Sequence, residues 1–346
     1  MTAAEPRSVR VGVIGAGIMG ADHARIIDAF VGSARVEAVA DVDRARAQAV
    51  AERIAARHGT SVRAPRVSPD ARSLIDDPEV DAVIIASHDS THAELALACL
   101  AAGKPVLCEK PLAPTVEECR RVVEADDRAA ALHGRRLVSV GFMRRFDPAY
   151  AEQKAAVTAG DIGTPLLVHG ISRGVSSAPG STSEGSITGS AIHEFDTIPW
   201  LLDSPITAVS WQAPRATGTE TGLQDPQVML IRTADGVLST LETFLNARYG
   251  YDILCEVVGE TGTRALRDPA RVVAKGSLAT SLSFAPDWRQ RFEDAYRLEL
   301  TAWITALQDG SESPLATARD GLAATAVAAA AISSMNSDGR WVQIDD

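Results

Sequence analysis

The sequence predicts an α/β protein with two domains, the first with a doubly wound parallel sheet and the second with an antiparallel sheet. In the first third, short apolar runs alternate with helical segments, which is the pattern of βαβ units. After about residue 145, strand-like runs follow one another closely and are linked by turn signals. A chain of 346 residues, at roughly 100–200 residues per domain, also fits two domains, which we place at 1–135 and 136–346.

The chain before about residue 145 is expected to alternate strands and helices. Its strands are almost wholly apolar, as is typical of parallel strands that are buried on both faces. Gly103 follows one of the helices and is a common stop signal. The expected strands are Val9–Ile14, Val36–Ala40, Ala82–Ala86, Pro105–Cys108 and Leu137–Val140, and the expected helices are Ala21–Phe30, Arg44–His58, Thr91–Ala102 and Val116–Leu132.

The second domain is expected to combine helices with an antiparallel sheet. Turn signals such as Asp235-Gly236 separate its strand-like runs. A Gly/Ser/Thr-rich stretch, Gly174 to Ser190, is too long for a plain connector and is a candidate functional loop. We expect helices at Pro148–Thr158, Arg291–Leu307 and Leu315–Met335, and strands at Leu166–Ile171, Thr207–Trp211, Gln227–Thr233, Val237–Leu245 and Ile253–Val258.

Composition and charge exclude several classes of function. The net charge of −11, from 34 basic and 45 acidic residues, argues against nucleic acid or an anionic membrane as the main partner. The cysteines show no C-x-x-C pair and no zinc-ligand spacing, so we expect no metal and a reduced compartment. No secretory signal is visible, and the alanine-rich run Leu322–Ile332 is well short of the ~20 residues that span a bilayer. We expect a soluble, cytoplasmic protein.

A glycine motif follows the first expected strand directly. Gly15-Ala16-Gly17-Ile18-Met19-Gly20 is G-x-G-x-x-G between a strand and a helix, which is the context that dinucleotide binding requires. The first glycine allows the tight turn, the second lets a pyrophosphate approach the backbone, and the third lets helix and strand pack closely. The helix N-terminus then faces the phosphates. The alternative is a glycine turn that holds no ligand.

An acidic residue, Asp41, ends the second expected strand and indicates which dinucleotide binds. Its carboxylate can accept hydrogen bonds from the adenosine ribose hydroxyls and would repel a 2′-phosphate, which favours NAD over NADP. Arg44 leaves NADP open, because an arginine there could hold that phosphate. FAD is a further alternative, although the sequence shows no other flavin signature.

Lysine is rare in this chain, which draws attention to the few that are present. The other basic residues are arginines, and the only lysines are Lys104, Lys110, Lys154 and Lys275. Lys110 belongs to the tripeptide Glu109-Lys110-Pro111 at the end of a parallel strand, where such sheets bind their ligands. A lysine there can donate to a hydroxyl or carbonyl oxygen beside a nicotinamide. The alternative is a surface lysine that closes a strand.

Three motifs together resemble the glucose–fructose oxidoreductase/inositol dehydrogenase/rhizopine-catabolism (Gfo/Idh/MocA) family. They are Gly15–Gly20, Glu109–Pro111 and the later His193-Glu194-Phe195-Asp196. Four further segments resemble bacterial myo-inositol 2-dehydrogenases in particular: Gly141–Asp147, Asp225–Val228, Tyr249–Asp252 and Cys255–Glu260. The likeness covers nearly the whole chain. It implies a Rossmann domain, a C-terminal α/β domain on an open, mostly antiparallel sheet, NAD(P)-dependent oxidation of a ring hydroxyl, and homotetramers or dimers built on that sheet.

The resemblance also implies roles for individual residues. His193 matches the catalytic histidine, and an imidazole suits abstraction of a hydroxyl proton; its alternative is a core or capping histidine. Lys110 matches the lysine that binds the reacting hydroxyl. The implied substrate contacts are Arg173, Asp196, Tyr249 and Tyr251, where Asp196 could instead orient the imidazole. The implied cofactor contacts are Gly15, Gly17, Ile18, Met19, Gly20, Asp41, Ser87, His88, His92, Glu109 and Lys110, although His92 could also be a helix-start residue without a ligand.

The chain departs from the inositol dehydrogenase pattern at three pocket positions. Gly189 stands where these enzymes carry an aspartate, four residues before the catalytic histidine, and Ser172 and Gly174 stand where they tend to carry histidine and asparagine. A site that loses such polar groups discriminates polyols less well, because substrate hydroxyls are left unpaired. We therefore expect a substituted, amino- or differently configured cyclitol, or a pyranose, as the substrate rather than plain myo-inositol.

These observations predict an NAD-dependent oxidoreductase that interconverts a secondary alcohol and a ketone on a cyclitol or sugar. The main alternative is a non-catalytic NAD(P)-binding sugar sensor of the same fold. The presence of both Lys110 and His193 argues against that alternative, whereas Gly189 leaves it open. Reduction of dihydrodiol or biliverdin type is a third possibility, which the Tyr249–Asp252 motif disfavours.

Overall fold

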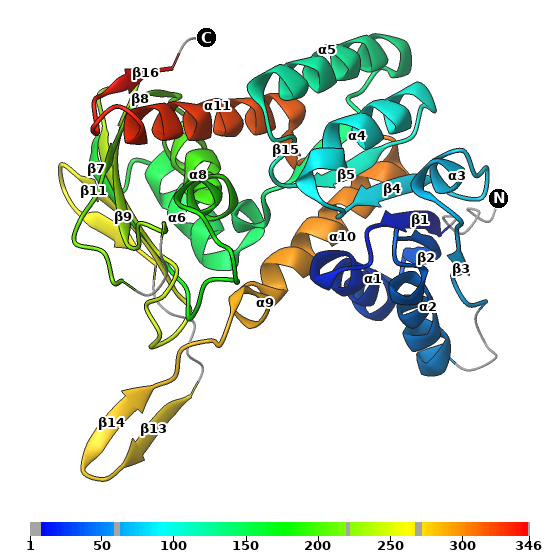
Figure 1. Cartoon of the computed structure of the whole chain (residues 1–346), viewed down its shortest axis with the longest axis horizontal. Helices are drawn as coiled ribbons and strands as arrows, with labels where there is room; N and C mark the ends of the chain where they lie inside the picture. The colour runs from blue at the N-terminus through cyan, green and yellow to red at the C-terminus, as the bar shows by residue number, and fades with distance from the viewer. Residues whose placement is uncertain (1–7, 59–62, 219–221, 267–271, 345–346) are drawn as a thin grey trace. The chain divides into compact units, whose positions relative to one another are not determined.

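The computed structural model describes residues 8–58, 63–218, 222–266 and 272–344 (Figure 1). The chain divides into two compact units, of which the first comprises Met1–Met143 and Tyr296–Leu322 and the second Arg144–Ala295 and Ala323–Asp346. These ranges differ from the predicted domains, 1–135 and 136–346. The difference has a physical reason, because residues 138–141, predicted as a strand, and residues 316–317, which were not, both pair into the sheet of the first unit.

The first unit is built on the predicted parallel sheet. Its seven strands run in the order β15-β6-β5-β4-β1-β2-β3, and every neighbouring pair is parallel except β15 with β6. All six residues of β1 are buried, as its apolar sequence predicts. The strands are β1 Val9–Ile14, β2 Ala34–Ala40, β3 Arg66–Val67, β4 Ala82–Ile85, β5 Val106–Glu109, β6 Val138–Gly141 and β15 Ala316–Thr317.

Helices alternate with these strands, as the sequence predicts. Residues at the helix ends determine where the helices begin and stop. At the start of α5, the Thr115 hydroxyl accepts a hydrogen bond from the backbone N–H of Glu118, and at its end Gly134 takes a left-handed conformation. The division between the units falls within α10 and α11. The helices are α1 Ile18–Phe30, α2 Arg44–His58, α3 Ala71–Ile75, α4 His92–Ala101, α5 Val116–His133, α10 Glu293–Asp309 and α11 Ala318–Met335.

The second unit is built on a mostly antiparallel sheet, which confirms the predicted fold class. Its order is β12-β11-β7-β10-β9-β8-β16, and β7 with β10 is the one parallel pair. Buried and part-exposed residues alternate along β10, as expected when one face of a sheet is covered. The strands are β7 Pro165–Arg173, β8 Ile206–Gln212, β9 Gln227–Thr233, β10 Leu238–Phe244, β11 Asp252–Gly259, β12 Thr263–Ala265 and β16 Val342–Gln343.

Helices α6 and α8 lie on one side of this sheet in Figure 1. The Gly/Ser/Thr-rich stretch predicted as a loop instead contains a short helix and a π-helical turn, Ile187–Ala191, that leads directly into α8. The sequence also gave no sign of a separate two-stranded hairpin, β13 Val273–Gly276 with β14 Ala279–Leu282. The helices of this unit are α6 Pro148–Thr158, α7 Ser183–Ser186, α8 Ile192–Leu202 and α9 Trp288–Arg291.

The surroundings of the cysteines and the lengths of the helices bear on two questions, thiol reactivity and membrane spanning. The four cysteines, Cys99, Cys108, Cys119 and Cys255, are all buried. Burial raises the pKa of Cys99 and of Cys255 to about 12, so neither thiol is a ready nucleophile in the folded chain. Within the ranges that the structure describes, no helix has both the length and the apolar character needed to cross a membrane.

Candidate active site

The glycine motif forms a tight turn between β1 and α1. Gly15 has a φ of +91°, and a Cβ there would lie 2.5 Å from the backbone of Ala86 and Ser87. A Cβ on Gly20 would lie 1.8 Å from the carbonyl oxygen of Gly15, so α1 can pack against the turn only with glycine here. A Cβ on Gly17 would meet no protein atom within 4 Å. Two glycines therefore allow close packing, while the third leaves space for a ligand.

The N-terminus of α1 opens onto this space. Gly17 is its N-cap and no side chain caps the helix, so the first backbone N–H groups remain available to an anion. Ile18, at the first position, is 66% exposed. Val42, which was not identified from the sequence, is fully exposed beside Asp41 and presents apolar surface at the same edge of the sheet. The turn, the helix end and these surfaces fit a dinucleotide.

Asp41 is anchored to the glycine turn. One carboxylate oxygen accepts the backbone N–H of Ala16 at 2.6 Å, and the other accepts the N–H of Asp43 at 2.8 Å. Each oxygen keeps a lone pair, so the expected contact with ribose hydroxyls stays a prediction. Arg44 is exposed at the start of α2.

The residues that follow β4 divide into exposed and buried groups. The side chain of His88 is 81% exposed, and the Ser87 hydroxyl lies 2.7 Å from that of Thr91. His92 is buried, with Nδ1 2.7 Å from the carbonyl oxygen of Pro111 and Nε2 3.1 Å from that of Ser87. Both ring nitrogens thus hold the loops after β4 and β5 together. This arrangement supports the alternative role of His92, in which it is structural and does not bind the cofactor.

The predicted catalytic lysine follows β5 directly. Lys110 lies at the carboxyl end of this strand, and the Lys110–Pro111 peptide is cis. Glu109, whose contact with the cofactor stays a prediction, is buried, with one carboxylate oxygen 2.7 Å from Nε2 of His23 and the other accepting the backbone N–H of Lys110 at 3.2 Å. His23, on α1, was not identified from the sequence. The sequence does show a polar side chain, His23, on the apolar face of the expected helix, but this pattern does not indicate which residue it contacts.

The predicted catalytic histidine belongs to the second unit, whereas Lys110 belongs to the first. His193 lies in the first turn of α8 and is 9% exposed. The π-helical turn that precedes it is a feature often found at functional sites. Asp196, predicted to contact substrate or to orient the imidazole, is buried and forms a two-pronged ion pair with Arg145, at 2.5 and 3.0 Å.

A buried ion pair lies beside the histidine on α8. Arg144 is 1% exposed, pairs with Glu194, and packs its guanidinium over the rings of Tyr150 and Phe292. Burial raises the pKa of Glu194 although the Arg144 charge opposes the rise. The second carboxylate oxygen of Glu194 has no hydrogen-bond partner among the described residues. Neither residue was identified from the sequence, because an arginine in a short connecting segment is usually exposed.

Arg173 ends β7 inside a polar network. Its guanidinium forms a fork with Glu242, at 2.7 and 2.8 Å, and lies 3.0 Å from the hydroxyl of Tyr249. Tyr249 donates in turn to Asp252. The hydrogen bonds to Glu242 raise the pKa of Arg173, which keeps its charge. The structure thus brings Arg173 and Tyr249 together, while Tyr251 packs edge-on to Phe292.

The three positions that depart from the inositol dehydrogenase pattern differ in the space around them. A Cβ on Gly189 would meet nothing within 4 Å, so this position is open. A Cβ on Gly174 would lie 3.0 Å from the carbonyl oxygen of Leu245, so this position is closely packed. The hydroxyl of Ser172 lies 3.3 Å from that of Ser190 in the π-helical turn. Only Gly189 therefore offers the additional room that small residues were expected to leave.

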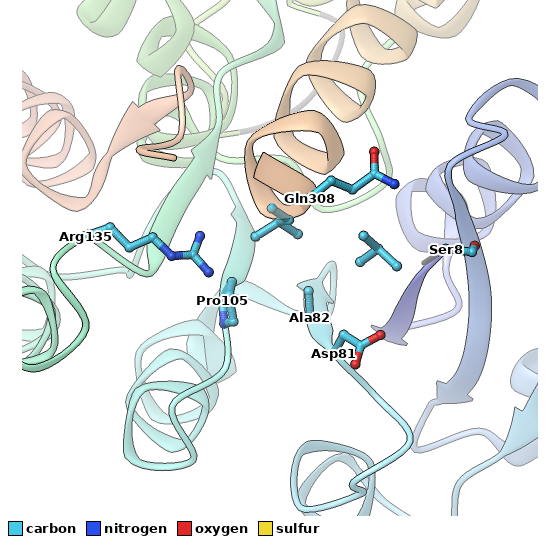
Figure 2. Close-up of a pocket in the computed structure, with 8 residues that line it drawn as sticks. Ser8, Asp81, Ala82, Pro105, Arg135 and Gln308 are labelled. Atoms are coloured by element: carbon cyan, nitrogen blue, oxygen red, sulfur yellow. The ribbon is translucent and has the colours of Figure 1, made fainter. Parts of the chain in front are cut away.

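A cavity of about 350 Å³ lies in the first unit, away from the glycine turn (Figure 2). It is lined at the starts of strands, by Val9 of β1, Ala82 of β4 and Pro105 before β5, together with Arg135 and Gln308. Parallel sheets bind their ligands at the carboxyl ends of the strands, and this cavity is at the opposite edge. It is therefore not part of the candidate active site.

Comparisons with known proteins agree with this geometry. Residues 9–142 match the family described as "Oxidoreductase family, NAD-binding Rossmann fold", and residues 150–264 match the "GFO/IDH/MocA C-terminal domain". The chain is 51% identical over 337 residues to inositol 2-dehydrogenase 2 of Paenarthrobacter aurescens, which covers 97% of this chain and 98% of the relative. It is 45% identical to inositol 2-dehydrogenase 1 of Saccharopolyspora erythraea, with 98% and 97% covered.

Solved structures show the same relationship. The crystal structure of myo-inositol dehydrogenase from Lactobacillus casei, in complex with NAD(H) and myo-inositol, matches with a TM-score of 0.91 and 32% identity, covering 98% of this chain and 97% of that one. A myo-inositol dehydrogenase from Corynebacterium glutamicum matches with a TM-score of 0.84 and 27% identity, covering 98% and 99%. The glycine turn, the lysine after β5 and the full-length similarity lead to one conclusion: this chain belongs to the Gfo/Idh/MocA family of NAD-binding oxidoreductases.

Proposed function

We propose that the chain is an NAD-dependent dehydrogenase that oxidises a secondary ring hydroxyl of an inositol-type cyclitol to a ketone. One observation carries the proposal: 51% identity to an inositol 2-dehydrogenase over 97% of the chain, with Lys110 and His193 both present. NAD, when bound, supplies the hydride acceptor. The cell's NAD/NADH ratio sets the direction, so the same site can also reduce the ketone.

The chain's own residues divide the remaining work. Lys110, at the carboxyl end of β5, donates a hydrogen bond to the reacting oxygen. His193 accepts the hydroxyl proton as the alcohol is oxidised. The turn at Gly17 and the N-terminus of α1 hold the pyrophosphate, and Asp41 accepts from the ribose hydroxyls. That carboxylate favours NAD over NADP.

Within this class, we propose a variant cyclitol or a pyranose rather than myo-inositol as the preferred substrate. Gly189 presents open space and no carboxylate, and Ser172 presents a short hydroxyl that already lies near Ser190. A polyol hydroxyl that finds no partner in the site loses binding energy of about 1–3 kcal/mol. An amino or bulkier substituent can occupy the room at Gly189.

A panel of inositol isomers, aminocyclitols and pyranoses tests this function, with NADH formation measured by absorbance. We expect turnover with at least one cyclitol or pyranose, and a lower KM with NAD than with NADP. Myo-inositol as clearly the best substrate would overturn the variant-substrate proposal but support the dehydrogenase. Gly189→Asp fits the open space and is the matched variant; we expect it to improve turnover of myo-inositol relative to the wild type.

The absence of a carboxylate at Gly189 also favours a second candidate, a non-catalytic sugar sensor that binds NAD(P). Measurable NADH formation with any polyol would exclude it. Tight polyol binding by calorimetry, with no turnover across the panel, would support it instead.

We also propose a cytoplasmic homo-oligomer, a tetramer or dimer, built on the sheet of the second unit. Leu166 and Leu167 on β7 are 49% and 38% exposed, which is costly for a surface that faces only water. The buried thiols suit a reducing compartment. Light scattering of the purified chain gives the oligomeric state, and a monomer at micromolar concentration would contradict the proposal.

A further inference from the structure

A buried histidine–glutamate pair lies directly behind Lys110. His23 of α1 is completely buried, and the Glu109 side chain at the end of β5 is only 7% exposed. Nε2 of His23 lies 2.7 Å from a carboxylate oxygen of Glu109. The ring of Tyr296, on α10, packs edge-on against His23 with 5.8 Å between the centroids. Helices on both sides thus hold the imidazole against the strand end.

The neighbouring strand leaves room for this carboxylate. Gly141 of β6 pairs with Glu109 in the register of the sheet. A Cβ on Gly141 would lie 3.2 Å from the Glu109 carboxyl carbon and from one of its oxygens, which is tighter than an ordinary contact. Glycine at this position therefore lets the carboxylate turn back toward α1. The other carboxylate oxygen accepts the backbone N–H of Lys110, so the pair also fixes the peptide that carries the lysine.

The hydrogen bonds indicate which group carries the charge. Nδ1 of His23 is buried and has no hydrogen-bond partner in the described part of the chain. A carboxylate oxygen can only accept, so Nε2 of His23 is the atom that donates to Glu109. Burial alone would raise the pKa of Glu109, but His23, Lys110 and His92 outweigh it and lower that pKa. Glu109 therefore holds a buried negative charge.

Four other titratable groups surround that charge. Lys110 and His92 lie close enough to lower the pKa of the Glu109 carboxyl, burial raises the pKa of the Cys108 thiol well above normal, and the Tyr296 ring packs against His23. His92 lies with its two ring nitrogens 2.7 and 3.1 Å from the carbonyl oxygens of Pro111 and Ser87. Glu109 is thus the only anion among these groups, and it lies one residue from the lysine.

We propose that His23 and Glu109 are positioning residues, which hold a buried negative charge and the Lys110 backbone in place so that Lys110 stays an ammonium donor toward the reacting oxygen. The inference rests on the proposed function of Lys110 and extends it to two residues that act through contacts within the protein. It also explains why a charged residue is buried at the end of an otherwise apolar strand. Without His23, Glu109 would be left without its buried partner and would take up a proton.

The scarcity of lysine permits a direct test. Reductive methylation with ¹³C-formaldehyde labels the lysines Lys104, Lys110, Lys154 and Lys275, besides the N-terminus, and keeps each amine titratable. The spectrum of a Lys110→Arg variant assigns the Lys110 signal. We expect Glu109→Gln to lower the pKa of Lys110 by roughly one pH unit or more, because a neighbouring opposite charge is lost. Lys154, which pairs with Asp203 in the other unit, is the internal control and should not move.

Variants of His23 separate charge from packing. His23→Leu should lower the Lys110 pKa as Glu109→Gln does, whereas His23→Gln, which keeps a donor for Glu109, should leave it near the wild-type value. In the pH profile of kcat, the decline at alkaline pH should begin at a lower pH in Glu109→Gln and His23→Leu than in the wild type. The KM for NAD should change little. A Lys110 pKa unchanged in His23→Leu, or in a folded Glu109→Gln, would overturn the proposal.

The two readouts distinguish this inference from the proposed function. The nuclear magnetic resonance titration needs no turnover, so it reports on the pair even in an inactive protein. A wild type that forms no NADH with any cyclitol or sugar would refute the proposed function alone. If the wild type is active but the pKa of Lys110 is the same in the wild type, Glu109→Gln and His23→Leu, the positioning role alone would be refuted.

Discussion

Replacing Gly17 by alanine should separate cofactor binding from folding. The residue has φ −69° and ψ −161°, which alanine adopts without strain, and its Cβ would meet no protein atom within 4 Å. The added methyl group would instead occupy the space through which a pyrophosphate reaches the N-terminus of α1. We therefore expect Gly17→Ala to fold normally and to bind NADH poorly.

The size of both effects follows from the structure. Alanine is a poorer N-cap than glycine by roughly 0.5–1 kcal/mol, while the loss of backbone freedom in the unfolded chain stabilises by about 0.4–1 kcal/mol, so stability should change little. Loss of one charge-assisted hydrogen bond to the phosphate costs about 1.5–3 kcal/mol. At 1.4 kcal/mol per tenfold, Kd for NADH should rise roughly 10- to 150-fold.

Fluorescence titration with NADH and thermal unfolding of the apo protein measure the two quantities. Gly32→Ala is the matched control, because Gly32 is exposed, lies in the turn after α1 and has no atom within 4 Å of its Cβ position. Gly20→Ala is the opposite control and should lose both binding and stability, since its Cβ would lie 1.8 Å from a backbone oxygen. If Gly17→Ala bound NADH as the wild type does, the dinucleotide would not approach through this turn.

Three further results are expected from the ion pairs and the cofactor edge. Arg144→Met should destabilise the fold by about 3–5 kcal/mol in urea unfolding, because Glu194 is left buried and unpaired, and adding Glu194→Gln should recover most of the loss. Folding lowers the pKa of Glu109, so its ionised carboxylate stabilises the fold above about pH 4.5, and this stabilisation is lost as the pH falls through the pKa of the folded state. In thermal unfolding between pH 3 and 6, Glu109→Gln should therefore lose less stability on acidification than the wild type. Asp41→Ser should bring the Kd values for NADPH and NADH closer together, with Arg44 retained; an unchanged ratio would remove Asp41 from cofactor choice.

Local sequence patterns were sufficient for the parallel sheet and the glycine turn. Each buried strand and the turn at Gly15 depend on residues that are adjacent in the chain, so their patterns are visible without tertiary information. The two-residue strand Ala316–Thr317 was not predicted, because so short a segment carries no periodicity and pairs with Val140 far away in sequence. The hairpin at 273–282 was not predicted, because both of its strands are exposed throughout and lack buried–exposed alternation.

Site residues show the same limit. Gly15, Gly17 and Gly20 were assigned from a local motif, and the structure gives each one a steric reason. Glu109 and His92 were placed near the right strand ends, but what they contact depends on His23 and on backbone carbonyls brought close only by folding. A single sequence shows that such residues are polar and sit at strand ends. It cannot show whether they face a ligand or the protein interior.

The most direct test of the central claim, that this chain is a dehydrogenase with His193 as its proton acceptor, is to compare NADH formation by the wild type and by His193→Ala. NADH affinity is measured on the same samples. We predict wild-type turnover with a cyclitol or sugar, a loss of roughly 10²- to 10⁴-fold in the variant, and an unchanged Kd for NADH. Near-normal turnover by the variant would contradict it.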